Sequence, residues 1–349
     1  MGSRGIPGLL REAWKVPAST QVTVHSLATN PSQPETKVAT ISFSEMPGFL
    51  QAKLNEWTSE ANGKKKLTLD THFNGFTPLH ADPDSDCLMD CIAISGLGGH
   101  ASGSFKSKGQ PFMWLRDALP RDLPQARIFI CGLDVDSVNS KSWGNITDLG
   151  TEFRDMINQL RPSKIGPPRP LVLIGHSLGG LIVKEAVINM HRFKTKDDQM
   201  NLQSLRAGLF FGVPNLGMDV QSLIPMVQGN ANEYLVNTLK PGSEILSWQK
   251  GAFETASQKV LKYWYYETKE SPTAQKVGSK WAMTGPRALL VEPNSATNGR
   301  PSSSEPDGHF VQPINHTHSE MVKFPHQNDQ DYLRVCDHLK SIKRGIPRR

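Results

Sequence analysis

The chain has 349 residues, of which 37% are hydrophobic and 21% charged, and its formal net charge is +6. This length and composition are those of a globular protein with a large core. The positive charges are spread along the sequence without the interleaving of aromatic and basic residues that is typical of nucleic-acid binding, which excludes that class of function.

Four cysteines are too few and too apolar in their surroundings for a disulfide framework, and we expect buried free thiols. No cysteine and histidine spacing matches a metal site, so neither a metal nor an organic cofactor is expected. The first 20 residues lack the apolar core of a signal peptide, and no stretch is long enough to span a membrane. We therefore expect an intracellular protein, cytoplasmic by default, with mitochondrial or endoplasmic-reticulum association as the alternative.

Residues 1–84 predict an extension of the domain that follows them. Gln21–Leu27 and Lys37–Phe43 alternate as strands do, Pro47–Glu60 favours a short amphipathic helix, and Leu67–Pro78 is extended. We interpret this region as antiparallel edge strands that lead into a larger sheet.

From residue 85 to 345, strands alternate with helices, which predicts a doubly wound, mostly parallel sheet of the α/β class. Strands are expected at Cys87–Ile94, Arg127–Cys131, Leu171–Ile174, Gly208–Gly212, Leu261–Glu267 and Ala288–Val291. Helices are expected at Trp114–Leu119, Ile146–Leu160, Val220–Val227, Glu233–Leu239, Ser243–Lys259 and Tyr332–Ile342. The helices within about 217–260 are interpreted as a cap, whose Leu223, Ile224, Met226, Leu235 and Leu239 either line an acyl pocket or pack on the core.

The most informative motif is Gly175-His176-Ser177-Leu178-Gly179. It follows a strand and begins a helical pattern, which is the context of the nucleophile elbow of an α/β-hydrolase. The two glycines allow close backbone approach, and the turn exposes the Ser177 hydroxyl. The N–H of Leu178 then points from the start of the helix toward developing negative charge.

A glycine-rich loop, Ser95–His100, follows the strand at Cys87–Ile94. Such a loop can donate a backbone N–H to an oxyanion, and we assign this role to Leu97 together with Leu178. The alternative is an ordinary turn.

The general base is expected after the nucleophile and the acid in chain order. Among five late histidines, the pattern leaves His316 and His318, just before the closing helix; the others, His309, His326 and His338, fit a loop or a helix surface. Glu292, directly after the predicted strand Ala288–Val291, is the preferred acid, because it could orient a histidine ring. Asp219 and then Asp307 are the alternatives.

With these residues in place, the chain resembles the serine-esterase-type α/β-hydrolase domains found at the N-terminus of many fungal NLR-like and ankyrin-repeat proteins. Those domains are related to eukaryotic serine-active-site-containing lipid-remodelling proteins. The resemblance covers about residues 85–342, and it rests on Gly96–His100 with Trp114–Pro120, the elbow with Lys184, Gly208–Pro214, and His318–Phe324. It implies that His318 is the base.

The chain departs from this pattern at two places. Ser95 stands where the family usually has histidine, and the family's Thr-Pro-His-Arg-Gly turn is Val213–Gly217 here, without its histidine and arginine. The loop at Ser95 can still donate its backbone N–H groups.

The predicted function is hydrolysis of carboxylic esters, lipid or other acyl esters, through a Ser177–His318–Glu292 triad and an acyl-enzyme. Acyl transfer uses the same groups and is not separated from hydrolysis. The alternative is an inactive or weakly active module for signalling or protein interaction, either free-standing or part of a longer receptor. The basic runs at Gly63–Lys66 and near the C-terminus are interpreted as solvated surface, with peripheral contact to acidic lipids as the alternative.

Overall fold

The computed structural model describes residues 2, 5–51, 56–61, 63, 65–81, 87–133, 144–165, 168–221, 223–278, 280–301 and 308–346. Asp307, one of the alternative acids, lies outside the described residues. Within them, no helix combines the length and the apolar character needed to cross a bilayer.

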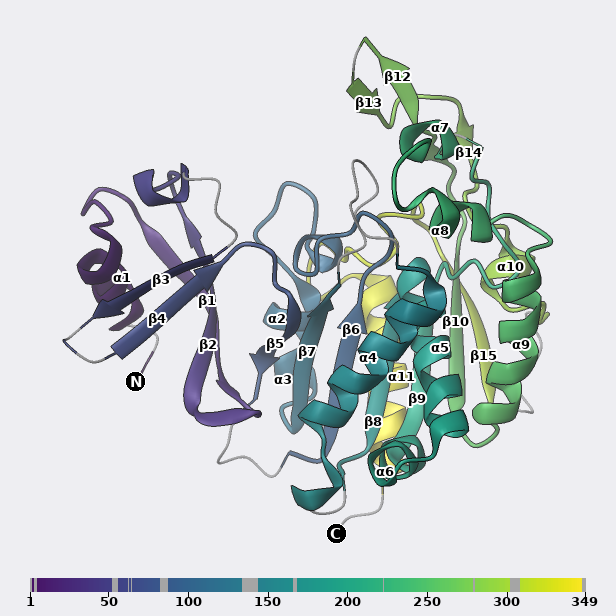
Figure 1. The fold of residues 1–349 in the computed structure, drawn as a ribbon, viewed down its shortest axis with the longest axis horizontal. Helices are drawn as coiled ribbons and strands as arrows, with labels where there is room; N and C mark the ends of the chain where they lie inside the picture. Colours follow the sequence, from purple (N-terminus) through teal and green to yellow (C-terminus); the bar gives the residue numbers. More distant parts are fainter. Residues whose placement is uncertain are drawn as a thin grey trace.

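The centre of the molecule is a seven-stranded sheet in the order β15-β10-β9-β8-β6-β7-β5 (Figure 1). Its strands are β5 (Gly75–His80), β6 (Met89–Ile94), β7 (Ala126–Gly132), β8 (Leu171–His176), β9 (Leu205–Phe211), β10 (Leu261–Glu267) and β15 (His309–Ile314). All of these pairs are parallel except β5 with β7. Because β6 and β8 are buried along their whole length, their residues are mostly apolar and do not alternate with polar ones.

Helices cover both faces of this sheet, each over its own apolar cluster. One face carries α4 (Ile146–Leu160), α5 (Leu178–Phe193), α6 (Lys196–Ser204) and α9 (Glu244–Ala256); the other carries α2 (Trp114–Asp117), α3 (Leu119–Asp122) and α11 (Gln330–Arg344). The start of α4 is fixed by a capping box, in which Asn145 accepts from the N–H groups of Thr147 and Asp148. The prediction of α4 at Ile146–Leu160 is confirmed.

The N-terminal region contributes one strand, β5, to the central sheet. Before it come α1 (Ile6–Trp14), the hairpin β1 (Val22–Asn30) with β2 (Gln33–Phe43), the 3₁₀ turn η2 (Gly48–Gln51), and the hairpin β3 (Glu56–Ala61) with β4 (Lys65–Asp70). The helix predicted at Pro47–Glu60 is wrong. Trp57 and Ala61 are buried on one face of β3 while their neighbours are exposed, and the indole N–H of Trp57 donates to the carbonyl oxygen of Phe49.

The end of the sheet also differs from the prediction. Ala288–Val291 is not a strand of the central sheet: β14 (Arg287–Ala288) pairs only with β11 (Ser271–Pro272), and a hairpin of β12 (Gln275–Val277) and β13 (Lys280–Ala282) lies between them. The last strand of the sheet is β15, in a segment for which no strand was predicted. As an edge strand, β15 is only partly buried, so its residues are more polar than those of β6 or β8.

The region predicted as a cap contains α7 (Ile224–Val227), α8 (Glu233–Thr238) and α9. Leu235 and Leu239 are buried in the core, and Leu223 and Ile224 pack against it. Short helices η3 (Gly103–Phe105), η4 (Ser163–Ile165) and α10 (Pro293–Ala296) complete the chain. Helices on both faces of a mostly parallel sheet confirm the predicted fold class: the chain has an α/β-hydrolase fold.

Candidate active site

The turn between β8 and α5 holds Ser177 in a strained backbone conformation. Its φ of 54° and ψ of −128° are unfavourable for a residue with a Cβ atom, and the surrounding structure must enforce them. A Cβ atom on Gly179 would lie 2.4 Å from the carbonyl oxygen of Ser95, and one on Gly175 would lie 2.5 Å from Cα of Gly180. The glycines of the motif are therefore required by the turn itself.

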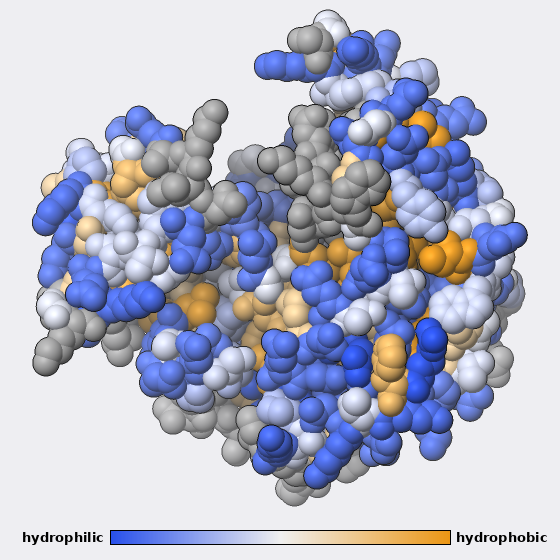
Figure 2. All heavy atoms as spheres, in the orientation of Figure 1, coloured by the Kyte–Doolittle hydropathy of each residue, from blue (hydrophilic) through white to orange (hydrophobic). Residues whose placement is uncertain are grey.

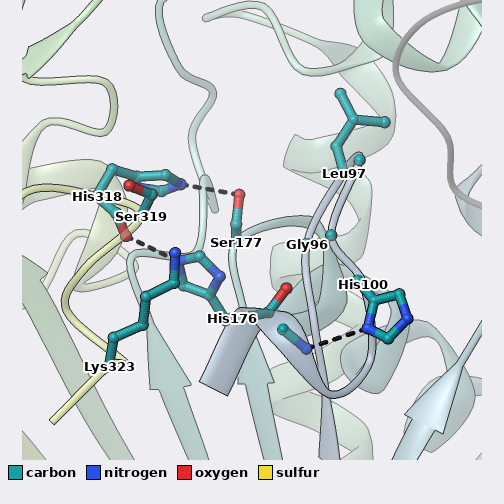
Figure 3. A pocket seen from close by; sticks show the side chains of 12 residues that line it. Gly96, Leu97, His100, His176, Ser177, His318, Ser319 and Lys323 are labelled. Carbon is teal, nitrogen blue, oxygen red and sulfur yellow. Dashed lines mark hydrogen bonds between the residues drawn. The ribbon is translucent and has the colours of Figure 1, made fainter. Parts of the chain in front are cut away.

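A line of hydrogen bonds runs from Ser177 through His318 to Glu267 (Figure 3 shows its first bond). Ser177 Oγ lies 3.0 Å from His318 Nε2, and His318 Nδ1 lies 2.6 Å from Glu267 Oε2. Because a carboxylate only accepts, Nδ1 donates to Glu267, which leaves Nε2 of the neutral ring to accept from the serine hydroxyl. The three side chains are buried.

Glu267, and not Glu292, is the carboxylate that contacts His318, so the sequence-based choice is corrected. Glu267 is the last residue of β10, and its second oxygen, Oε1, accepts from the N–H groups of Leu290 and Val291 at 2.9 and 3.2 Å. Glu292 is the residue before α10. The segment just before Glu292 therefore contributes to this contact through its backbone, because its N–H groups bind the second oxygen of Glu267.

The alternative acid Asp219 does not join the line either, because its Oδ1 accepts from the N–H of Gln221. Among the late histidines, His316 lies 4.0 Å from Asp331 and His338 Nδ1 lies 2.8 Å from the hydroxyl of Tyr265. Of the two histidines that the sequence left open, His318 is the one beside Ser177.

Two further contacts fix the backbone of His318. Its N–H donates to Ser271 Oγ at 3.1 Å, and its carbonyl oxygen accepts from His176 Nε2 at 2.9 Å. Burial lowers the pKa of His176 to about 3, and the neighbouring His318 and Lys323 act in the same direction. His176 is thus a neutral donor, a role that the sequence did not reveal because its acceptor is the backbone of a residue far along the chain.

The loop after β6 lies directly against the serine. A Cβ atom on Gly96 would lie 2.7 Å from Cβ of Ser177, so only glycine fits there. Leu97 follows in the same loop, beside Ser177 in Figure 3, and Leu178 is the first residue of α5. The first N–H groups of a helix have no partner within it, so that of Leu178 is available for an anion.

A cavity of about 330 Å³ opens over Ser177. It is lined by the glycine-rich loop, His100, Ser104, His176, His318, Ser319 and Lys323 (Figure 3). Burial lowers the pKa of Lys323 from its usual range. None of the described cap leucines lines this cavity; they pack on the core, and the side chain of Met226 lies outside the described part of the chain.

The loop that departs from the family pattern forms a buried polar cluster behind the site. Asn215 is fully buried and accepts from Lys184 Nζ at 2.8 Å, while its amide nitrogen donates to the carbonyl oxygens of Ser295 and Ala296. Burial lowers the pKa of Lys184 to about 7. Asn215 thereby connects α5 with α10, the short helix that follows Val291 in the chain.

All four cysteines are buried and free, as predicted. Among the residues that the structure describes, no three histidine, cysteine or acidic side chains are grouped so that they could hold a metal ion.

No protein-family model matches the chain. Over 178 residues it is 24% identical to Protein SERAC1 from Bos taurus, a match that covers 45% of this chain and 26% of that protein. The chain therefore aligns with about a quarter of the length of this relative.

Solved structures with a similar fold include the mature lipase BlEst2 from Bacillus licheniformis, with a TM-score of 0.46 and 13% identity over 76% of this chain and 97% of that one. A lipase-esterase related protein from Clostridium acetobutylicum has a TM-score of 0.42 and 12% identity, covering 77% and 99% of the two chains. The type II thioesterase YbtT has a TM-score of 0.40 and 13% identity, covering 78% and 98%. At such identities the likeness concerns the fold alone.

Proposed function

We propose that the chain is a serine hydrolase that cleaves carboxylic esters through an acyl-enzyme. The observation that carries this proposal is the line of contacts from Ser177 Oγ through both ring nitrogens of His318 to Glu267, beneath an open cavity. A weak nucleophile beside an oriented base is the arrangement that makes a serine hydroxyl reactive at neutral pH.

In the proposed reaction, Ser177 Oγ attacks the acyl carbonyl carbon while His318 Nε2 takes the hydroxyl proton. The tetrahedral intermediate collapses, the alcohol leaves with the proton from His318, and the acyl group stays on Ser177. Water, deprotonated by His318, then releases the acid. Glu267 keeps the ring in the correct tautomer and stabilises the imidazolium.

The oxyanion of the intermediate would be stabilised by the backbone N–H groups of Leu97 and Leu178. Such donors contribute about 3 to 4 kcal/mol each to the lowering of the barrier in well-studied serine hydrolases. Gly96 supports this assignment, because its lack of a side chain brings the loop against Ser177.

The substrate is proposed to be a lipid or another acyl ester, a class that rests on the sequence resemblance given above. Transfer of the acyl group to another alcohol in place of water belongs to the same proposal, since it uses the same acyl-enzyme. We also propose an intracellular location, which the buried free thiols support.

The deciding experiment is labelling of the full chain with a fluorophosphonate, in which the attacking serine oxygen forms a bond to phosphorus and fluoride leaves. Wild type and Ser319→Ala should be labelled, whereas Ser177→Ala and His318→Ala should not. Ser319 is the matched control, because it lines the same cavity. A folded wild type that takes no label would contradict the proposal and favour a signalling or interaction module.

A further inference from the structure

Between Glu267 and Val291 the chain makes one excursion away from the central sheet. Its base is closed by the pairing of β11 with β14 and by reciprocal backbone bonds, from Thr273 to Pro286 at 3.0 Å and from Gly285 to Thr273 at 2.9 Å. Beyond this base, the β12–β13 hairpin stands out from the body of the molecule (Figure 1, top right). The excursion is thus firmly closed at one end and projecting at the other.

The base of the excursion contacts two residues of the proposed triad. Ser271 accepts the backbone N–H of His318, and the N–H groups of Leu290 and Val291 bind Glu267 Oε1. Since these contacts come from both ends of the excursion, its position and that of the triad are coupled.

The tip of the excursion is both apolar and basic. Val277 and Met283 are 57% and 48% exposed. Lys276 and Lys280 are exposed on the two strands, and hydrophilic spheres extend along this projection in Figure 2. The sequence from Ser271 to Val291 contains Lys276, Lys280 and Arg287 and no acidic residue.

The hairpin lies at the carboxyl end of the sheet, where the cavity over Ser177 opens. The chain enters the excursion directly from the carboxyl end of β10. Lys323, which lines the cavity, adds a further basic side chain at this end. By contrast, α6 lies at the opposite end (Figure 1, bottom).

We propose that the β12–β13 hairpin docks on an anionic lipid surface. Exposed apolar side chains gain free energy by entering the headgroup region, and lysines beside them are attracted to anionic lipids. From Ser271 to Val291 the excursion carries three basic residues and no acidic one, which gives the charge complementarity that such a surface requires. Docking orients the opening of the cavity over Ser177 toward the lipid. This second part of the inference rests on the proposed function.

Binding is tested on the full chain carrying Ser177→Ala, so that no turnover occurs, by co-sedimentation with vesicles of phosphatidylcholine and phosphatidylserine in equal parts. The chain should bind these vesicles, bind pure phosphatidylcholine vesicles much less, and release at high salt. Lys276→Gln with Lys280→Gln should weaken binding about 25-fold, given about fivefold for each lysine near the surface. Val277→Asp should also weaken binding, because it replaces an apolar side chain with a negative charge that the anionic lipid repels.

The matched control is Lys194→Gln with Lys196→Gln, which removes the same charge from exposed positions near the start of α6. This variant should bind as wild type does. Thermal unfolding of all variants shows that each is folded. Failure of the Ser177→Ala chain to bind anionic vesicles, or equal binding by the hairpin and control variants made in it, would overturn the docking proposal whatever the chain's activity.

The second part is tested in the active chain by comparing an ester dissolved in water with an ester lipid embedded in anionic vesicles. The hairpin variants should lose turnover of the embedded ester and keep that of the soluble one. If the hairpin variants cleaved the embedded ester as fast as the unsubstituted active chain, the coupling of docking to substrate access would be overturned. A chain that binds vesicles through the hairpin but cleaves neither ester would contradict the proposed function and leave the docking intact.

Discussion

His176 Nε2 lies 2.9 Å from the carbonyl oxygen of His318, so the residue before the proposed nucleophile holds the backbone of the proposed base. Both rings are buried and their centroids are 5.0 Å apart. Two positive charges at this distance would repel each other strongly, and the low pKa of His176, about 3, avoids this. His176 can therefore stay neutral while His318 accepts the serine proton.

The first prediction concerns this contact. His176→Phe keeps an aromatic ring but leaves the buried carbonyl oxygen of His318 without its donor, which costs about 1 to 3 kcal/mol. Because that oxygen belongs to the base, kcat should fall on the order of ten- to a hundredfold. His176→Gln places an amide N–H near the same position and should restore most of the rate. Equal rates for the Phe and Gln variants on a soluble ester would show that the hydrogen bond does not position His318.

The second prediction separates Glu267 from Glu292. In Glu267→Gln, the amide oxygen should take the place of Oε1, where two backbone N–H groups converge, so that the amide nitrogen faces His318 Nδ1. That nitrogen donates, which forces the proton of the neutral ring onto Nε2 and prevents it from accepting from Ser177. Turnover should fall a thousandfold or more, by analogy with a triad that holds the wrong tautomer.

Glu292→Gln is the matched control and should retain nearly the full rate, because Glu292 precedes α10 and is not the carboxylate bound to His318. The reverse order of the two rates would restore the sequence-based assignment of the acid. Both variants are compared by kcat/KM on the same soluble ester.

The elbow could be predicted from the sequence because its parts are adjacent in the chain. A buried strand, two glycines and a helical apolar pattern identify Ser177 locally, and the structure has β8 and α5 at those positions. The strand Leu261–Glu267 was also predicted correctly, so the residue that contacts His318 already stood at the end of a recognised strand.

The acid was missed because the identity of the last two strands depends on pairing between distant segments. Ala288–Val291 is apolar throughout but only Ala288 lies in a strand, whereas His309–Ile314, which is interrupted by polar residues and a proline, forms the edge of the sheet beside β10. Apolar runs report burial, and Val291 is buried through its contact with the core rather than through a sheet ladder. The polar contacts of His176 and Ser271 depend on the same tertiary arrangement.

The third prediction concerns Gly212, which directly follows β9 and has a φ of +54°. A Cβ atom there would lie 2.8 Å from Met321 Sδ and 3.0 Å from His318 Nδ1, so Gly212→Ala should displace the ring of His318. We expect kcat/KM on a soluble ester to fall at least about tenfold, since small displacements of a catalytic group are costly. Gly242→Ala is the control: its φ is +80° and no atom lies within 4 Å of the added Cβ. It should lose stability, about 1 kcal/mol, and keep its rate.

The last prediction concerns the pH dependence of stability at Lys184. Burial lowers its pKa in the folded chain to about 7 from 10.5, so above pH 7 the unfolded chain binds more protons at this residue than the folded chain. Stability therefore rises with pH in this range, by about 2 kcal/mol between roughly pH 7 and pH 9, because the cost of burying the ammonium is relieved. Lys184→Met removes the titrating group while filling the same space.

The measurement is the free energy of unfolding by urea at both pH values for wild type and Lys184→Met. The difference between the two proteins cancels the contribution of the other titrating groups, so the wild type should gain about 2 kcal/mol relative to the variant. The Met variant leaves Asn215 Oδ1 without the Lys184 donor, a cost that does not change with pH and so does not alter the slope. Parallel pH dependence in the two proteins would mean that Lys184 keeps its proton in the folded chain, held by Asn215 and the nearby Glu254.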